Sequence, residues 1–369
     1  MKRLISLLLA LVLCFALFSV SYAGEPVTLL QNEPDRNIVG KGKLSNGKYD
    51  DNPIIEGVSP TTGLSWDGLY QPMLVQIDNS EGGIGPRAPW GGTDADIVYE
   101  TPLYRNGSTR ISFLFSDVMP TSAGPVRSAR VGHCWMREEW QAGFIFYGTQ
   151  ELKGSSCTAV FRETGADKKG VLFSGLVGSG KPWAKFLPRV AGIKAPNNVD
   201  ANVKEIAALI PQSHVAIPRP WLFTDELPTT GDFAHKITIG VGHEEYDSSF
   251  LYDDMDNLYY RYVHDQPYVS RDLTTKEEVR FGFNNVIVQR ATVEWNDNNS
   301  VAPVTHHIGK GNADFFIGGR YIPGYWERPD YTSRTVYMDM AGNEIQFQRG
   351  KTFILVTTNE TPVAYSSGQ

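Results

Sequence analysis

Cysteine is scarce in this chain, which has only 3 among its 369 residues. Cys14 lies in the apolar stretch at the start, so the remainder holds just Cys134 and Cys157. Two cysteines do not make a disulfide framework, and a chain of this length can bury a core without one. An exported pair could form a single disulfide, which the sequence leaves open, and neither thiol has neighbours that indicate a catalytic nucleophile.

A second long apolar run is also missing. The one present covers residues 4–20, follows a basic start and precedes a small-residue sequence ending in Ala23. These features are typical of a signal peptide, and the run is shorter than the roughly 20 residues that a membrane-spanning helix needs. We therefore predict a signal peptide over residues 1–23 and an extracytoplasmic protein, secreted or associated with the cell envelope. The alternative is a lipid anchor on Cys14, although Leu13 stands where lipoprotein signals require a small residue.

The chain lacks an excess of positive charge. It has 34 basic and 41 acidic residues, a net charge of −7, which becomes about −9 if Lys2 and Arg3 leave with the signal peptide. A negative chain does not attract nucleic acid or anionic lipid over its whole surface. We expect no nucleic-acid partner, and membrane contact only through the signal segment or a lipid on Cys14.

Complete cofactor and metal motifs are missing as well. The segment 175–181 begins like a nucleotide phosphate loop, but the next residue is Pro182, which has neither a hydroxyl nor a backbone N–H. The acidic run 253–257 lacks the glycine and the distal glutamate of a calcium loop. His306 and His307 are adjacent on a predicted strand, so they point to opposite faces. We expect no metal site and no cofactor.

Turn-forming residues divide the rest of the chain. The polar, turn-rich segment 24–52 predicts a flexible tether. In the segment 53–215, apolar runs of strand length alternate with two helical stretches, 131–141 and 199–210. This mixture predicts an N-terminal α+β domain with helices on a mixed sheet. The strands expected in it are 72–77, 96–99, 110–115 and 144–147.

A proline-rich passage at 211–230 predicts the boundary of this domain. In the segment 216–369 nearly every regular stretch has a strand pattern between turns, which predicts a mostly antiparallel, β-rich C-terminal domain. The fold class is therefore α+β, with a mixed-sheet α/β domain followed by a β-rich one. The strands expected in the second domain are 236–241, 258–263, 285–289, 301–307, 313–317, 335–338, 344–348 and 352–356.

Aromatic residues are abundant, with 8 Trp, 17 Tyr and 12% aromatic residues in all. Two interpretations remain open. The rings can fill half-buried positions between sheets, because tryptophan is often only partly buried in a core. Alternatively, some of them form platforms on which sugar rings stack.

One group of charged residues in the N-terminal half suggests a binding site: Asp78, Asp96, Arg110, Arg127 and Arg130. Asp78 closes a predicted strand, Arg110 opens another, and Arg127 and Arg130 lie in a turn that leads into a predicted helix. Arginine forks and the N–H groups of a helix N-terminus suit phosphate or carboxylate ligands. The group is a candidate anion site. Alternatively, its arginines pair with the carboxylates and hold the loop ends in place.

Several short segments, in one order, carry a resemblance to a known family. They are 59–64, 72–79, 95–100, 109–115, 124–130, 285–288, 309–313, 324–326 and 350–354. Together they resemble the YerB-like family of predicted bacterial lipoproteins, which is defined by an N-terminal and a C-terminal domain of unknown function. The resemblance spans about residues 59–357, implies an envelope location and supplies no reaction. At 146–149 and 194–198 this chain lacks a histidine that many relatives would be expected to have.

Two hypotheses for function follow. The first is a non-catalytic module of the cell envelope that binds a cell-wall polymer or an envelope protein, in line with the export signal and the missing nucleophile. The second is an enzyme that acts on an envelope phosphate ester. The order of Asp78, Arg110, Arg127 and Arg130 resembles the LytR-CpsA-Psr phosphotransferases, although only in the order of these motifs.

Overall fold

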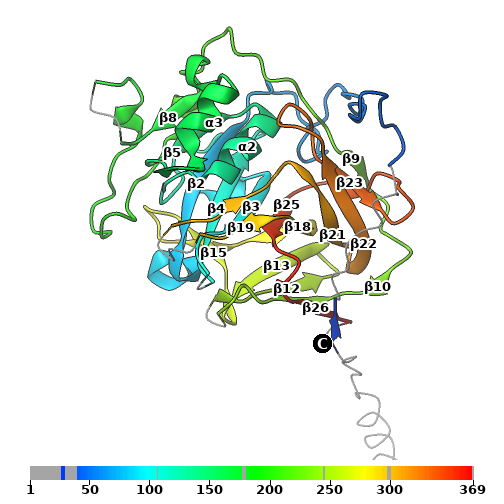
Figure 1. The fold of residues 1–369 in the computed structure, drawn as a ribbon. Helices are drawn as coiled ribbons and strands as arrows, with labels where there is room; N and C mark the ends of the chain where they lie inside the picture. Colours follow the sequence, from blue (N-terminus) through cyan, green and yellow to red (C-terminus); the bar gives the residue numbers. More distant parts are fainter. Residues whose placement is uncertain are drawn as a thin grey trace, which may run out of the picture.

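The computed structural model describes residues 26–29, 40–105, 107–176, 180–243, 246–296 and 301–367. The predicted signal peptide and Cys14 lie outside the described residues. The fold is mostly β-sheet with few helices (Figure 1). In the described ranges, no helix is long and apolar enough to cross a membrane.

Most long strands belong to one central sheet. From one edge to the other, its strands are β10 (Asp232–Phe233), β22 (Arg320–Arg328), β21 (Gly309–Ile317), β18 (Asn285–Arg290), β25 (Thr352–Thr357), β3 (Ile97–Pro102), β4 (Thr109–Phe115), β2 (Met73–Asn79), β5 (Gly143–Phe146) and β8 (Leu172–Ser174), with β23 (Val336–Asp339) paired to β22. Strands from both predicted domains therefore lie in the same sheet.

Seven strands of the central sheet point the same way. One of them is β22, because β22 and β18 are both antiparallel to β21. β18 and β3 are parallel to β25, and β2 and β8 are parallel to β5. β4 is antiparallel to both β3 and β2, so the two groups share one direction. The carboxyl ends of these strands therefore lie at the same end of the sheet. Open α/β sheets bind their ligands at this carboxyl end.

Burial on both faces explains the apolar sequences of the central strands. β2, β4, β18 and β25 are buried at every position. Tyr99 of β3 accepts a hydrogen bond from Trp140 Nε1 (2.8 Å) of helix α2 (Val131–Trp140), which places α2 on one face. Phe353 of β25 pairs with Val98, the neighbour of Tyr99, and so faces the other side. There its ring contacts Phe250, with centroids 5.0 Å apart.

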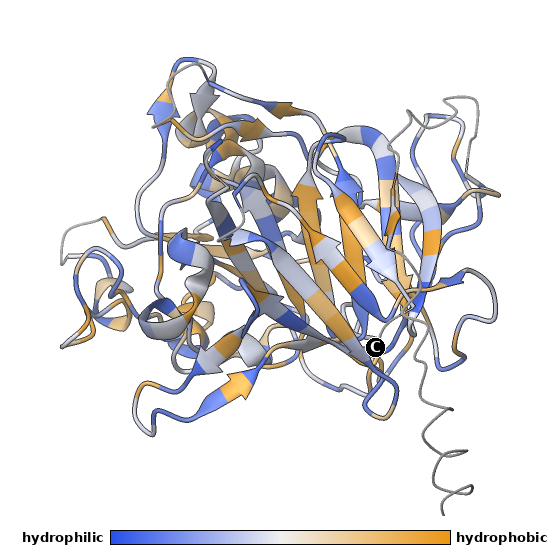
Figure 2. Ribbon diagram, turned by 90° about the horizontal axis from the view of Figure 1, so that it is seen from below, coloured by the Kyte–Doolittle hydropathy of each residue, from blue (hydrophilic) through white to orange (hydrophobic). Residues whose placement is uncertain are grey.

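Phe250 belongs to a second sheet, called here the outer sheet. Along its strands buried positions alternate with exposed ones, as in β11 (Lys236–Ile239), or with half-buried ones, as in β13 (Leu258–Val263), because only one face packs on the core. Figure 2, which views the molecule from below, shows hydrophobic and hydrophilic residues alternating along such strands. The strands of the outer sheet are β1 (Val27–Thr28), β26 (Val363–Ser366), β11 (Lys236–Ile239), β12 (Ser248–Asp253), β13 (Leu258–Val263) and β14 (Gln266–Pro267), with β17 (Gly282–Phe283) paired to β13.

Four two-stranded pairs complete the strand structure of the described residues. They are β6 (Glu151–Leu152) with β7 (Ser155–Ser156), β9 (Leu222–Thr224) with β24 (Gln346–Gln348), β15 (Val269–Arg271) with β16 (Glu278–Arg280), and β19 (Val293–Glu294) with β20 (Val304–Thr305). The predicted strand 301–307 is therefore confirmed only at its centre.

The helices are short. Besides α2 there are α3 (Cys157–Glu163), which lies near β5 and β8 in Figure 1, and α4 (Val203–Ala207). The prediction of a helix over 199–210 is wrong at its start. Val199 is extended there, because its carbonyl accepts a hydrogen bond from Val126 N (2.8 Å), and the Asn202 side chain caps α4 instead.

The expectation of a flexible tether over residues 24–52 is wrong for the residues of this segment that the structure describes. β1 pairs with β26 (Val363–Ser366), the last strand of the described residues. Tyr49 is only 8% exposed, packs with Tyr325 and Met338, and donates to Glu327 (2.8 Å). Local polarity predicted a flexible tether, but strand pairing and side-chain contacts with distant strands hold the described part of the segment in place.

The two predicted halves are not packed separately. β25 lies between β18 and β3, and it is parallel to both (Figure 1). The proline-rich passage also forms a strand, β9, which pairs with β24 near the end of the chain. The predicted division into two domains at 211–230 is therefore wrong as a structural boundary, because backbone hydrogen bonds of one sheet join the halves.

Candidate functional site

At the carboxyl end of β2, one carboxylate holds several guanidinium groups. Asp78 faces Arg110 in the register of β2 and β4. Its Oδ1 lies 3.5 Å from Arg110 Nη1 and 3.4 Å from Arg127 Nε, and its Oδ2 accepts from Arg87 Nη2 at 2.8 Å. Ser80 Oγ also donates to Asp78. We call Asp78, Arg87, Arg110, Arg127 and Arg130 the arginine cluster.

Positive charge exceeds negative charge in the arginine cluster. Arg130, at the start of α2, donates to the carbonyl of Ala129 (2.9 Å). Burial lowers the pKa of Arg110 to about 9, against the effect of Asp78, and the charges of Arg130 and Arg127 lower this pKa further. The Nε atoms of Arg110 and Arg130 are buried without a hydrogen-bond partner. The donor groups that an anion could reach belong instead to Arg87 and Arg127, whose side chains are 24% and 26% exposed.

Backbone hydrogen bonds hold the turn that carries Arg127 and Arg130. Asp78 N donates to Pro125 O and Arg127 N donates to Gln76 O, both at 2.9 Å, so the turn is joined to β2. On its other side, Tyr147 N, just beyond β5, donates to Arg127 O at 2.9 Å. The arginines therefore extend from a fixed backbone.

His133 fixes the start of α2. Its Nδ1 accepts from Arg130 N (3.0 Å), so the ring proton lies on Nε2, which donates to Thr101 Oγ1 (3.0 Å). Burial lowers the pKa of His133 well below its usual value, and the nearby Arg110 adds to this. With both nitrogens engaged and the ring neutral, His133 serves the structure.

Asp96 does not join the arginine cluster, which corrects the sequence prediction. It precedes β3 and so lies at the opposite end of the sheet from Asp78. Its Oδ2 accepts from Asp117 N (3.0 Å), and burial together with the charge of Asp117 raises the pKa of Asp96 to about 8. The antiparallel order of β2, β4 and β3, which sequence could not supply, separates the two carboxyl groups.

Arg87 is the cluster residue that sequence reasoning missed. It ends the sequence Gly85-Pro86-Arg87, which is similar to the Gly124-Pro125-Val126-Arg127 turn of the candidate anion site. This similarity could have identified Arg87 as a further candidate. The Asn197 side chain lies against Arg87, and its amide oxygen, oriented by these neighbours, accepts from Arg87 Nη2 at 2.7 Å.

The adjacent histidines His306 and His307 and the two cysteines lie outside the arginine cluster. His307 is buried, which lowers its pKa to about 3, whereas His306 contacts Glu294 at 2.9 Å. Cys134 and Cys157 are free and buried, and burial beside Cys157 raises the pKa of the Cys134 thiol well above its usual value. No three His, Cys, Asp or Glu side chains in the described ranges are placed to hold a metal ion.

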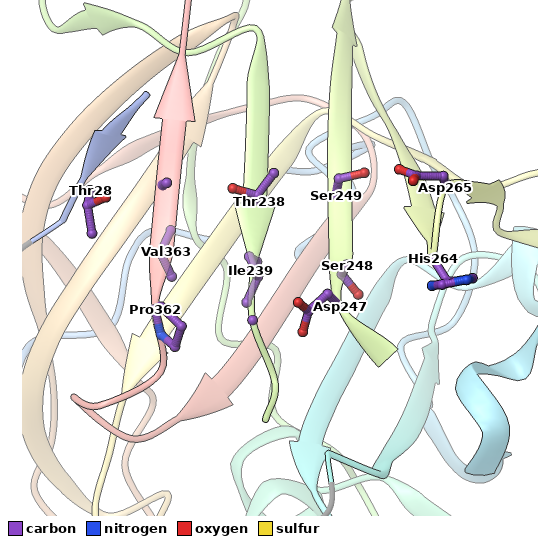
Figure 3. Close-up of a pocket in the computed structure, with 12 residues that line it drawn as sticks. Thr28, Thr238, Ile239, Asp247, Ser248, Ser249, His264, Asp265, Pro362 and Val363 are labelled. Atoms are coloured by element: carbon purple, nitrogen blue, oxygen red, sulfur yellow. The ribbon is translucent and has the colours of Figure 1, made fainter. Parts of the chain in front are cut away.

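A separate pocket of about 480 Å³ lies on the outer sheet (Figure 3). Hydroxyl groups of Thr28, Thr238 and Ser249 line it, together with the carboxylates of Asp247 and Asp265. In Figure 3 the three hydroxyl groups come from strands of the outer sheet, whereas Asp247 precedes β12 and Asp265 lies in the turn after β13. Carboxylates disfavour a negative ligand, so this pocket and the arginine cluster suit opposite kinds of charge.

The fold and the site define a β-rich protein whose two sequence regions share one sheet, with arginines gathered at one edge. The chain belongs to the family described as protein of unknown function (DUF3048): the N-terminal domain of that family matches residues 61–216 and the C-terminal domain matches residues 237–354. The resemblance to the YerB-like family is thereby confirmed.

Among solved structures, the chain is similar to the crystal structure of the YerB protein from Bacillus subtilis. The two are 23% identical, the match covers 81% of this chain and 96% of that one, and the TM-score is 0.65. At this identity the likeness establishes the fold alone. No curated protein matches the sequence.

Proposed function

We propose that this protein is an exported, non-catalytic module of the cell envelope that binds an anionic group of a cell-wall polymer or envelope partner at the arginine cluster. The observation that carries the proposal is the imbalance of charge. Three guanidinium groups, those of Arg87, Arg110 and Arg127, contact the buried carboxylate of Asp78, and Arg130 adds a fourth positive charge, whereas the other carboxylate near them is the exposed Glu81, 3.9 Å from Arg87 Nε. In a chain with a net charge of −7, such a cluster creates a local positive field that attracts an anion.

The state of Asp78 supports binding over catalysis. Its carboxylate is only 1% exposed and is shared by three arginines and Ser80. A carboxylate held in this way does not serve as a general base or a metal ligand. The alternative, an envelope phosphate-ester enzyme similar to the LytR-CpsA-Psr phosphotransferases in motif order, would require a carboxylate that is free to do so.

The extracytoplasmic location rests on the N-terminal sequence. Its basic start, apolar run and small residues before Gly24 are typical of a cleaved signal. Mass spectrometry of the protein from its own host should therefore find Gly24 as the first residue. A diacylglyceryl group on Cys14 would contradict cleavage at that position and favour a lipid anchor.

Arg127→Ala is the variant that tests the site. The Arg127 side chain is 26% exposed, and its removal leaves Asp78 paired with Arg87 and Arg110, so the melting temperature should change little. Loss of a charge-assisted hydrogen bond should weaken the binding of inorganic pyrophosphate and of polyanionic wall fractions roughly 10- to 100-fold, as measured by calorimetry. Arg127→Lys should recover only part of the affinity, because lysine lacks the planar fork.

The matched control is Arg349→Ala. Arg349 pairs with Asp225 at the surface (2.9 Å) and precedes β25, so this variant loses the same charge at the end of the sheet opposite to the cluster. It should bind like the parent. Unchanged binding by Arg127→Ala, together with a large fall in its melting temperature, would make the arginine cluster purely structural.

A further inference from the structure

A strongly basic segment lies beside the arginine cluster. Residues 168–199 contain six basic residues and no acidic residue, in a chain where acidic residues outnumber basic ones. Four of these cations are exposed on one stretch, which we call the basic loop (residues 180–198). They are Lys181, Lys185, Arg189 and Lys194.

Direct contacts join the basic loop to the cluster. Arg189 Nη2 donates to the hydroxyl of Tyr147 (2.8 Å), and the guanidinium lies 5.2 Å from the centre of that ring. Tyr147 in turn donates its backbone N–H to Arg127. At the other end of the loop, Asn197 contacts Arg87. The basic loop therefore lies next to Arg87 and Arg127, the two exposed arginines of the cluster.

The cations of the basic loop are not neutralised by acids. Among the described residues, none of the four has a carboxylate within 4 Å. The first acid after the loop, Asp200, accepts hydrogen bonds from Trp90 Nε1 (2.8 Å) and Ser122 Oγ (2.9 Å), and is thereby occupied. An exposed ammonium without an acidic partner can exchange water for a phosphate oxygen at little cost.

Aromatic rings lie beneath three of these cations. Lys181 Nζ lies 5.5 Å from the centre of the Trp183 ring, and Lys185 Nζ lies 4.7 Å from that of Phe186. Trp183 is itself anchored, because its Nε1 donates to Ser174 O (3.0 Å) at the end of β8. Contacts with rings restrict the lysine side chains while leaving their N–H groups available to a ligand.

The backbone of the basic loop is also fixed. Val190 N donates to Asn198 O (2.7 Å), Asp200 N donates to Pro188 O (2.9 Å), and Asn202 N donates to Phe186 O (2.9 Å). The second half of the loop is thus a hairpin tied to α4. Because the hairpin holds Arg189 and Lys194 in place, a ligand that binds them loses less entropy than one that must order a free loop.

We propose that the ligand of the arginine cluster is a linear polymer with repeating phosphate groups, one phosphate binding at Arg87 and Arg127 and further phosphates binding along the basic loop. This inference rests on the proposed function and adds the class of ligand. The row of separate cations that begins at the cluster can bind several negative charges of one polymer chain, whereas a single small anion would contact the cluster alone. Arginine forks favour phosphate, to which they donate two parallel hydrogen bonds.

The test measures binding of inorganic phosphates of increasing length to the full mature chain. Affinity should rise from orthophosphate to tripolyphosphate to a long polyphosphate, and it should fall with salt most steeply for the longest. The double variant Lys181→Ala/Lys185→Ala should bind long polyphosphate roughly 10-fold or more weakly than the parent. Its affinity for orthophosphate should be the same as that of the parent. Arg127→Ala should weaken the binding of every length.

Lys236→Ala/Lys310→Ala is the matched control, because both lysines are exposed and lie on β11 and β21. It removes the same charge and should leave every affinity unchanged. If Lys181→Ala/Lys185→Ala binds long polyphosphate like the parent while Arg127→Ala loses orthophosphate, the polymer inference fails and the proposed function stands. If Arg127→Ala binds all phosphates like the parent, the proposed function fails as well.

Two comparison ligands distinguish other sources of negative charge. Polyglutamate of similar length should bind at least 10-fold more weakly than polyphosphate, and equal binding would overturn the preference for phosphate. Vesicles containing phosphatidylglycerol should bind weakly. If they bind through Lys181 and Lys185 while polyphosphate does not, the surface recognises a membrane and the inference is wrong.

Discussion

At the residue scale, the main feature is the unequal pairing around Asp78. One carboxylate stabilises three arginines from β4, the turn after β4 and the loop after β2, so chain segments far apart in sequence meet at one charge. Arg110 is 2% exposed and belongs to the core, whereas Arg127 and Arg87 keep about a quarter of their side chains exposed. Exposure therefore divides the cluster into a structural member and members that a ligand can reach.

Asp96 gives a prediction about pH. Its pKa is raised from 3.8 to about 8, chiefly by burial, so the folded chain keeps a proton that the unfolded chain loses. The stability that this proton contributes is complete below about pH 4 and is lost as pH rises toward 8. Urea denaturation from pH 5 to 8 should therefore show the parent losing stability relative to Asp96→Asn, by at most about 1.4 kcal/mol per pH unit.

Asn at position 96 can still accept the hydrogen bonds from the backbone of Ser116 and Asp117. Asp272→Asn is the control, since Asp272 is exposed and its pKa lies below the usual value because nearby backbone N–H groups donate to it. Its stability should follow that of the parent over the same range. Parallel curves for the parent and Asp96→Asn would mean that Asp96 is ionised in the folded protein throughout.

At the scale of elements, one buried ion pair joins the outer sheet to the central sheet. Arg261 of β13 lies 2.7 Å from Glu100 Oε2 of β3, and both are nearly inaccessible to solvent. The guanidinium also stacks on Tyr268, 4.2 Å from its ring centre. The pair thus adds a polar contact to the aromatic packing between the two sheets.

Glu100→Gln should therefore be costly. The substitution leaves the charge of Arg261 buried without its partner, which costs about 3–5 kcal/mol in comparable sites. Chemical denaturation would measure this loss. Glu278→Gln provides the control, because its partner Arg271 is at the surface, and it should cost less than about 1 kcal/mol. Similar small losses for both variants would show that packing alone holds the sheets together.

Prediction of the elements from sequence succeeded where burial was uniform or strictly alternating. The apolar run of β2 and the alternation of β13 were placed within about two residues of their observed ends. β22 was missed because Pro323 and Gly324 interrupt it, yet its neighbours β21 and β23 hold it in the sheet. The start of the predicted helix at 199 failed because Val199 and Ala201 are extended and pair with residues 123–126.

At the scale of the whole molecule, the shared central sheet makes the two halves of the chain depend on each other. β25 is hydrogen-bonded to β18 of its own half and to β3 of the other half. Neither half can bury both faces and both edges of its strands without the other. The matches to separate N-terminal and C-terminal family domains therefore describe regions of sequence that complete one structure.

A protease recognition sequence inserted between Thr229 and Thr230, both exposed, tests this dependence. After cleavage, the two fragments should elute together from a sizing column and separate only in denaturant. Unfolding of the cleaved and intact proteins should each give one transition by both circular dichroism and tryptophan fluorescence. Fragments that separate without denaturant, or two resolved transitions, would establish independent domains.

Local properties of the chain were sufficient to predict the β-rich C-terminal half, the family and the arginine-bearing turn, because the spacing of apolar residues, the turn residues and the order of motifs are all features of short segments. The α+β class predicted for the whole chain overestimated the helices, since the fold is mostly β-sheet. Short segments do not predict which charged residues lie close together in the fold. Asp78 and Asp96 are similar in sequence, each beside a buried strand, and only the antiparallel insertion of β4 places them at opposite ends of the sheet. Likewise, Arg87 and the basic loop reach the cluster because β2, β5 and β8 are parallel, so that the segments following them meet at one edge.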